Sequence, residues 1–124
     1  MHWRDLAVWK LSHEMVLEVY RLTSLFPDHE KFRLTSQLCR AAISVPANIV
    51  EGNARYSRKE YIQFLITARA SLEETRYHGL LARDLQYIKS SDYDQFEAKA
   101  ERISRMLNAF LRSLRAKGTS AREK

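Results

Sequence analysis

Apolar side chains recur at steps of three and four residues along most of this chain, and that spacing places them on one face of an α-helix. Four stretches carry the pattern, at about residues 5–25, 30–51, 57–88 and 90–118, where the second starts between positions 30 and 34. Short polar connections separate the stretches. The pattern therefore predicts an all-α fold, an antiparallel up-down-up-down four-helix bundle.

The ends of these stretches carry recognisable signals. Pro27 closes the first, because the residue before a proline is driven out of the helical region. Ser57 and the glutamate three residues later have the spacing of a capping box. Gly118 is expected to end the last helix. The chain therefore divides into a four-helix domain over residues 1–118 and a basic tail, 119–124, that is polar enough to be disordered.

Pro46 interrupts the apolar stripe of the second helix. A proline removes one backbone donor and presses on the carbonyl four residues back, so we expect the helix to kink there. Small residues on both sides of Pro46 would let a neighbouring helix approach closely, and Gly52 offers a left-handed end. The sequence thus predicts a kinked and closely packed second helix.

The run from Gln37 to Gly52, QLCRAAISVPANIVEG, resembles the signature of a bacterial family, the 23S rRNA intervening-sequence proteins or four helix bundle proteins. The resemblance covers nearly the whole chain, including FLITARASLEET at 64–75. It departs at Cys39, where the family usually has a second arginine, at Phe32-Arg33 and at Ala70. The motif positions, for which we expect structural roles, are Gln37, Arg40, Pro46, Asn48, Glu51, Gly52, Arg55 and Glu74.

The resemblance implies more than the fold. Members of this family form ring-like homopentamers, and they resemble the accessory proteins of diversity-generating retroelements, which bind nucleic acid and a reverse transcriptase. By that resemblance the expected partners are further copies of this chain, ribosomal RNA or another nucleic acid, and a protein partner.

Composition narrows the class further. Three Gly and two Pro leave little room for hairpin turns, and the single Cys excludes an intramolecular disulfide. Asp5 and Lys10 interrupt the early apolar residues, so no signal segment is recognisable, and no apolar run is long enough to span a bilayer. We expect the protein to be cytoplasmic and not to associate with a membrane. A net charge of +6 and a pI near 9.7 favour an anionic partner.

No constellation in the sequence indicates catalysis. The four histidines fall on different stretches, and there is no HExxH, no Cys cluster and no Gly-rich phosphate loop. Glu74 and His78, four residues apart, are expected to form a hydrogen-bonded pair at the surface or between helices. Cys39 is expected to be a buried structural cysteine. We therefore expect no enzyme, no metal and no cofactor.

The basic positions carry the functional hypothesis. Arginines seven residues apart form one stripe on a helix, at about 10 Å per step, which suits contacts to successive phosphates. The candidate nucleic-acid-binding residues are Arg69, Arg76 and Arg83 on the third helix, Arg105 and Arg112 on the fourth, and Arg55, Arg58 and Lys59 at the second connection. Beside that connection, Tyr56 and Tyr61 are candidates to stack on unpaired bases.

Two alternatives to this hypothesis stay open. The arginines are equally compatible with a solvated face and salt bridges between subunits. The third helix also carries apolar residues outside its main stripe, namely Ile62, Ile66, Leu80 and Leu81. A helix that is apolar on more than one side is expected to pack against more than one neighbour. The chain is therefore also a candidate for a homo-oligomeric scaffold that docks a protein partner.

Overall fold

The computed structural model describes the backbone of residues 1–123 and the side chains of residues 1–117. Within this range it contains α-helices and short 3-10 helices (η) and no strand. The elements are η1 (Trp3–Asp5), α1 (Ala7–Thr23), η2 (Asp28–Glu30), α2 (Leu34–Asn53), α3 (Arg58–Asp84) and α4 (Ser90–Glu123). The all-α, four-helix fold expected from the sequence is confirmed.

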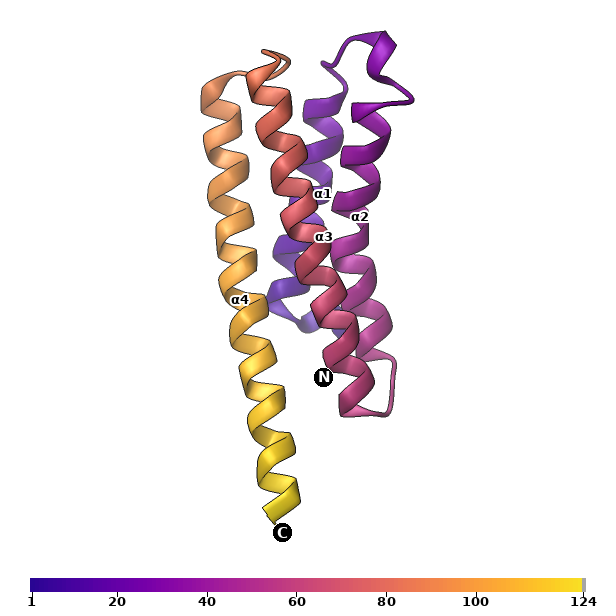
Figure 1. Cartoon of the computed structure of the whole chain (residues 1–124), viewed down its shortest axis with the longest axis vertical. Helices are drawn as coiled ribbons and strands as arrows, with labels where there is room; N and C mark the ends of the chain where they lie inside the picture. The colour runs from indigo at the N-terminus through magenta and orange to yellow at the C-terminus, as the bar shows by residue number, and fades with distance from the viewer. Residues whose placement is uncertain (124) are drawn as a thin grey trace.

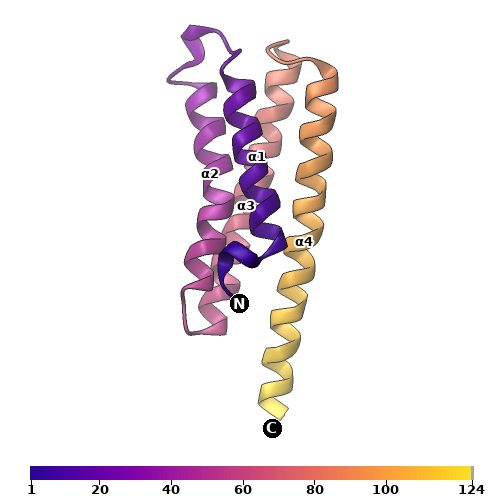
Figure 2. The same ribbon diagram turned by 180° about the vertical axis from the view of Figure 1, so that it is seen from behind.

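The four long helices lie side by side as a bundle (Figure 1). Each contacts two neighbours: α2 packs on α1 and α3, and α4 packs on α1 and α3. The α1–α2 and α3–α4 connections lie at one end of the bundle, and the α2–α3 connection lies at the other, where α4 extends past the other helices (Figure 1). Seen from behind, η1 crosses from the start of α1 towards α2 (Figure 2).

Local signals set both ends of α3. The Ser57 hydroxyl accepts a hydrogen bond from the backbone N–H of Glu60 at 3.3 Å, which confirms the expected cap. At the other end, the N–H groups of Gln86 and Tyr87 donate to the carbonyls of Arg83 and Ala82, each at 2.9 Å. This is a Schellman motif, and it places Gln86 at φ 64°, in the left-handed region that glycine adopts most easily.

Two expected helix ends are wrong. α4 continues past Gly118 to Glu123, because a single glycine costs a helix only about 1 kcal/mol and ends it only where the chain also turns away. The side chains from position 118 onward lie outside the described residues, so the expected disorder of 119–124 stays a prediction. Gly52 lies inside α2, which ends at Asn53, and no glycine in the described backbone has a positive φ.

α2 runs through Pro46 as one helix. Pro46 is one of the buried residues of α2. The kink expected at this position stays a prediction.

The core runs along the bundle axis between the four helices. Each helix contributes its three-and-four-spaced apolar residues, and the largest fully buried side chains include Met15, Ile49, Leu65, Leu72, Phe96, Ile103, Leu107 and Leu111. Within residues 1–123, no helix is long and apolar enough to cross a membrane.

Two glycines let helices approach closely. A Cβ on Gly52 would lie 2.8 Å from Tyr61 Cδ1 and 2.9 Å from Phe64 Cβ, so Gly52 brings α2 against α3. A Cβ on Gly79 would overlap the ring of Phe96, so Gly79 brings α3 against α4. The role of Gly52 is therefore close packing and not a left-handed helix end.

Candidate nucleic-acid interface

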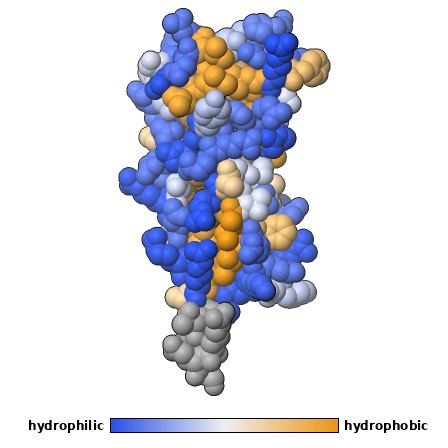
Figure 3. Space-filling model, viewed as in Figure 1, coloured by the Kyte–Doolittle hydropathy of each residue, from blue (hydrophilic) through white to orange (hydrophobic). Residues whose placement is uncertain are grey.

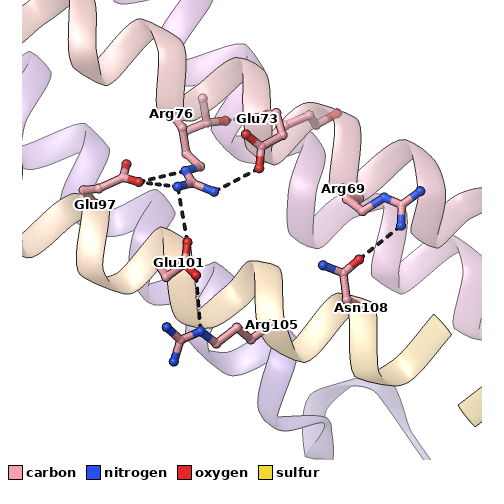
Figure 4. Close-up of polar contacts among 9 residues, drawn as sticks. Arg69, Glu73, Arg76, Glu97, Glu101, Arg105 and Asn108 are labelled. Carbon is pink, nitrogen blue, oxygen red and sulfur yellow. Dashed lines mark hydrogen bonds and ion pairs between the residues drawn. The ribbon is translucent and has the colours of Figure 1, made fainter. Parts of the chain in front are cut away.

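Arg76 lies at the centre of a charged network between α3 and α4 (Figure 4). Its Nε donates to Glu97 Oε1 at 2.9 Å, its Nη1 donates to Glu73 Oε1 at 3.0 Å, and its Nη2 donates to Glu97 and, at 3.3 Å, to Glu101. The hydrogen bond to Glu97 is the largest cause of a raised Arg76 pKa, against a smaller opposing effect of burial. Three carboxylates thus surround one guanidinium whose side chain is 23% exposed.

The other two arginines of the α3 row are also engaged. Arg69 Nη1 donates to Asn108 Oδ1 of α4 at 3.1 Å (Figure 4). The Arg83 guanidinium donates twice to Asp84 Oδ1, at 3.1 and 3.0 Å, and lies 4.7 Å from the ring centre of Tyr93. The seven-residue spacing does put the three arginines on one stripe, but that stripe lies along the α3–α4 seam. Their partners belong to the same chain.

The arginines of α4 are more open. Arg105 is 76% exposed, and its Nε donates to Glu101 Oε1 at 3.2 Å. Arg102 and Arg112 are exposed too, and Arg112 forms no ion pair with any side chain of residues 1–117. These three lie on the outer side of α4, at steps of three and seven, so their guanidiniums are presented to solvent.

The α2–α3 connection carries a second group of open cations. Arg55, Arg58 and Lys59 are all exposed. Arg55 lies 4.9 Å from the ring centre of Phe64, a cation–π contact that leaves its charge in place. Neither Arg58 nor Lys59 pairs with a carboxylate in the part of the chain whose side chains are described. Arg58 and Lys59 are therefore open to solvent without an ion pair among the described side chains, and the exposed Glu60 follows them in the chain.

The helix segments that carry the two open groups are neighbours. Tyr61, in the first turns of α3, packs edge-on against Phe110 of α4, with ring centres 5.3 Å apart. The start of α3 thus lies beside the part of α4 around Phe110, and Arg112 and Lys117 follow on that part of the helix. We call the exposed side chains of Arg55, Arg58, Lys59, Arg105 and Arg112 the basic end.

The two candidate stacking tyrosines differ. Tyr56 is fully exposed. Tyr61 is half-buried, its hydroxyl accepts from Asn53 Nδ2 at 3.2 Å, and burial raises the pKa of that hydroxyl. Tyr61 is therefore a packing residue, and only Tyr56 presents its ring to solvent.

The motif residues mostly join α2 to α3. Arg40 Nη2 donates to a Glu74 carboxylate oxygen and, at 2.9 Å, to Gln37 Oε1. Asn48 Nδ2 donates to the carbonyl and the hydroxyl of Ser44, and Ser44 Oγ lies 2.8 Å from Ser71 Oγ of α3. Glu51, by contrast, is exposed and makes no ion pair with a described side chain.

His78 corrects one expectation. Glu74 binds Arg40, and His78 Nδ1 is buried with no hydrogen-bond partner among residues 1–117, so the expected His78–Glu74 pair is absent there. Burial is the largest cause of a lowered His78 pKa, Glu74 opposes it, and Arg40 adds to it. Among the described residues, no group of three or more His, Cys, Asp or Glu could hold a metal.

Cys39 is half-buried, and its Sγ lies 3.6 Å from Thr23 Oγ1 of α1. This places the thiol in the α1–α2 contact, at less than the full burial that we expected.

The structure has an apolar groove between η1, α1 and α2 that was not predicted from the sequence. Its volume is about 260 Å³, and it is lined by Trp3, Trp9, His13, Val16, Ile43, Pro46, Ala47 and Val50. Trp9 stacks on His13 at 5.2 Å and meets Trp3 edge-on at 4.8 Å. No periodic signal marks Trp3, because η1 reaches the groove only by crossing back towards α2 (Figure 2).

Comparison with known proteins supports the fold. The model of the 23S rRNA-intervening sequence protein family matches residues 4–109. A crystal structure from Bacteroides thetaiotaomicron, of a protein of unknown function from the S23 ribosomal protein family, superposes with a TM-score of 0.79 at 25% identity. The match covers 85% of this chain and 98% of that one. No match was found among curated proteins.

Proposed function

This chain belongs to the 23S rRNA-intervening sequence protein family, and we propose that it is a non-catalytic protein that binds the sugar–phosphate backbone of RNA or DNA through its basic end. The observation that carries the proposal is the lack of ion pairs at Arg58, Lys59 and Arg112 within residues 1–117. Cations that keep their full charge attract phosphates most strongly. The net charge of +6 acts in the same direction.

The proposal assigns different roles to the eight basic residues expected to bind. Arg55, Arg58, Lys59, Arg105 and Arg112 contact phosphates. Arg69, Arg76 and Arg83 contact Asn108, Glu97 and Tyr93 of α4 and contribute little to binding, since each would first have to leave its present partners.

The test is fluorescence anisotropy with labelled RNA and DNA at low and at near-physiological salt. We expect binding that weakens steeply with salt, because each neutralised phosphate releases counterions. The double variant Arg58→Glu/Lys59→Glu should lose at least about tenfold in affinity. The slope of log affinity against log salt concentration should also become shallower, by the amount that corresponds to roughly two phosphate contacts. Its fold should persist, because glutamates are favourable in the first turn of a helix.

A matched control has the same change of charge elsewhere. Lys10 on α1 and Lys31 beside η2 are exposed and lie outside the basic end. The variant Lys10→Glu/Lys31→Glu should bind nearly as the wild type does. Equal losses in the two double variants would show that net charge alone drives binding, and unchanged binding by Arg58→Glu/Lys59→Glu would refute the proposed site.

We also propose that the chain acts as a homo-oligomer, a pentamer by resemblance to its family, in the cytoplasm. Several large apolar side chains remain open to solvent, with exposures of 58% at Leu17, 86% at Phe32 and 60% at Tyr77. Figure 3 shows one apolar patch near the end of the bundle that carries the α1–α2 connection, and a narrower apolar strip further along the helices. Light scattering after size exclusion tests this, and a monomer at high concentration would contradict it.

The apolar groove favours a second candidate function, a scaffold that docks a protein partner. Ala47 is an exposed residue of its lining, so Ala47→Arg fills the groove without disturbing the core. Under this alternative, the native chain retains a stoichiometric protein during purification and the Ala47→Arg variant does not. If the native chain and the Ala47→Arg variant both bind nucleic acid and neither retains a protein partner, that result counts against the scaffold function.

A further inference from the structure

Tyr56 lacks the packing that its position normally provides. It directly precedes Ser57, the N-cap of α3, and Tyr61 is the fourth helical residue after that cap. Apolar residues at these two positions often pack on each other as a hydrophobic staple. Here Tyr61 packs on Phe110 and hydrogen-bonds Asn53, and Tyr56 has a relative exposure of 107%. The staple is not formed, and both faces of the Tyr56 ring are open.

The surroundings of Tyr56 are cationic. Arg55 precedes it, and Arg58 and Lys59 follow after the capping serine, all three exposed. An open aromatic ring with cations on both sides in the chain is the combination by which proteins bind single strands: bases stack on the ring and charged side chains bind the adjacent phosphates. Bases in a duplex are stacked on each other and offer no free face except at the ends.

We propose that Tyr56 stacks on an unpaired base, so that the nucleic acid bound at the basic end is a single strand or a single-stranded loop rather than a duplex. This inference rests on the proposed function and sharpens it. Arg55, Arg58 and Lys59 hold the phosphates on either side of the stacked nucleotide. The contact requires no particular base, because every base has a π-face.

Three variants of one residue isolate the stacking. Tyr56→Leu keeps an apolar side chain and removes the ring, Tyr56→Phe keeps the ring and removes the hydroxyl, and Tyr56→Ala removes both. None should alter thermal stability, since the side chain packs on nothing. Tyr77→Leu is the matched control, because Tyr77 is a 60% exposed tyrosine on α3, away from the basic end.

The probes are a labelled single-stranded RNA of about 20 nucleotides and the blunt duplex of the same sequence, each titrated by anisotropy. For the single strand, we expect about tenfold weaker binding with Tyr56→Leu and Tyr56→Ala and nearly unchanged binding with Tyr56→Phe and Tyr77→Leu. For the duplex, all variants should bind as the wild type does, and more weakly than the single strand.

The outcomes separate this inference from the proposed function. If Tyr56→Leu binds the single strand as tightly as the wild type, or loses equally for strand and duplex, stacking is refuted while phosphate binding stands. If the wild type binds neither probe even at low salt, the proposed function fails, and the stacking inference fails with it.

Discussion

The α3–α4 seam and the basic end both carry basic side chains, and they differ in the groups that face those side chains. Arg76 on the seam meets Glu73, Glu97 and Glu101. Arg58 and Lys59 at the basic end meet no carboxylate within residues 1–117. The two regions therefore differ in how much of their positive charge the surrounding residues leave uncompensated. On the seam, carboxylates of both α3 and α4 compensate Arg76, Asp84 of α3 pairs with Arg83, and Asn108 of α4 accepts a hydrogen bond from Arg69.

The largest effect that we expect comes from the seam. Gly79→Val places a branched side chain where a Cβ already overlaps Phe96, so it should lower the free energy of unfolding by about 3 kcal/mol. Chemical denaturation measures it. The double variant Gly79→Val/Phe96→Leu should recover part of the loss, because the two side chains share one space. Additive losses would mean that the contact is not the cause.

The next effect tests the comparison directly. Arg76→Ala leaves carboxylates of two helices without their cation and should destabilise the bundle by about 2 kcal/mol. Arg58→Ala should cost at most about 0.5 kcal/mol, since its side chain is exposed. Nucleic-acid affinity should show the reverse order, with a salt slope lowered by about one only for Arg58→Ala. Equal effects on both readouts would remove the distinction between seam and basic end.

A smaller effect separates stability from binding. Gln86 occupies the left-handed position of the Schellman motif at the end of α3, where a side chain costs about 1 kcal/mol relative to glycine. Gln86→Gly should therefore raise the free energy of unfolding by about 1 kcal/mol. Its affinity for nucleic acid should equal that of the wild type. An affinity that rises with stability would mean that binding reports the folded fraction.

The smallest effect is a pH dependence at His78. Its folded-state pKa is lowered mainly by burial, so the unfolded chain binds the proton more readily. Stability should be unaffected above about pH 6.5, the ordinary histidine pKa, and should fall as the pH drops from there through the folded pKa. Denaturation at pH 7 and pH 5.5 should show less acid destabilisation for His78→Gln than for the wild type. Equal losses would exclude His78 as the source.

Local features of the sequence predicted local features of the structure. The apolar spacing predicted four helices because an α-helix has 3.6 residues per turn, so the apolar residues of its packed face recur at steps of three and four. The Ser57 cap was predictable because it depends on a serine and a backbone N–H three residues away. Gly118 and Gly52 were misread as helix ends, since a glycine marks an end only when the chain leaves the helix there. The tight contact of Gly52 with Tyr61 depends on another helix.

The sequence by itself determined the helices, their apolar faces, the stripe that holds Arg69, Arg76 and Arg83, and the excess of positive charge. Only the tertiary structure decided that this stripe faces Glu97 and Asn108 of α4, that Tyr61 packs while Tyr56 stays open, and that η1 completes an apolar groove. The physical reason is the distance along the chain over which each interaction acts. Helix periodicity and caps act over a few residues, whereas the compensation of a charge or the burial of a ring depends on which segments the fold brings together.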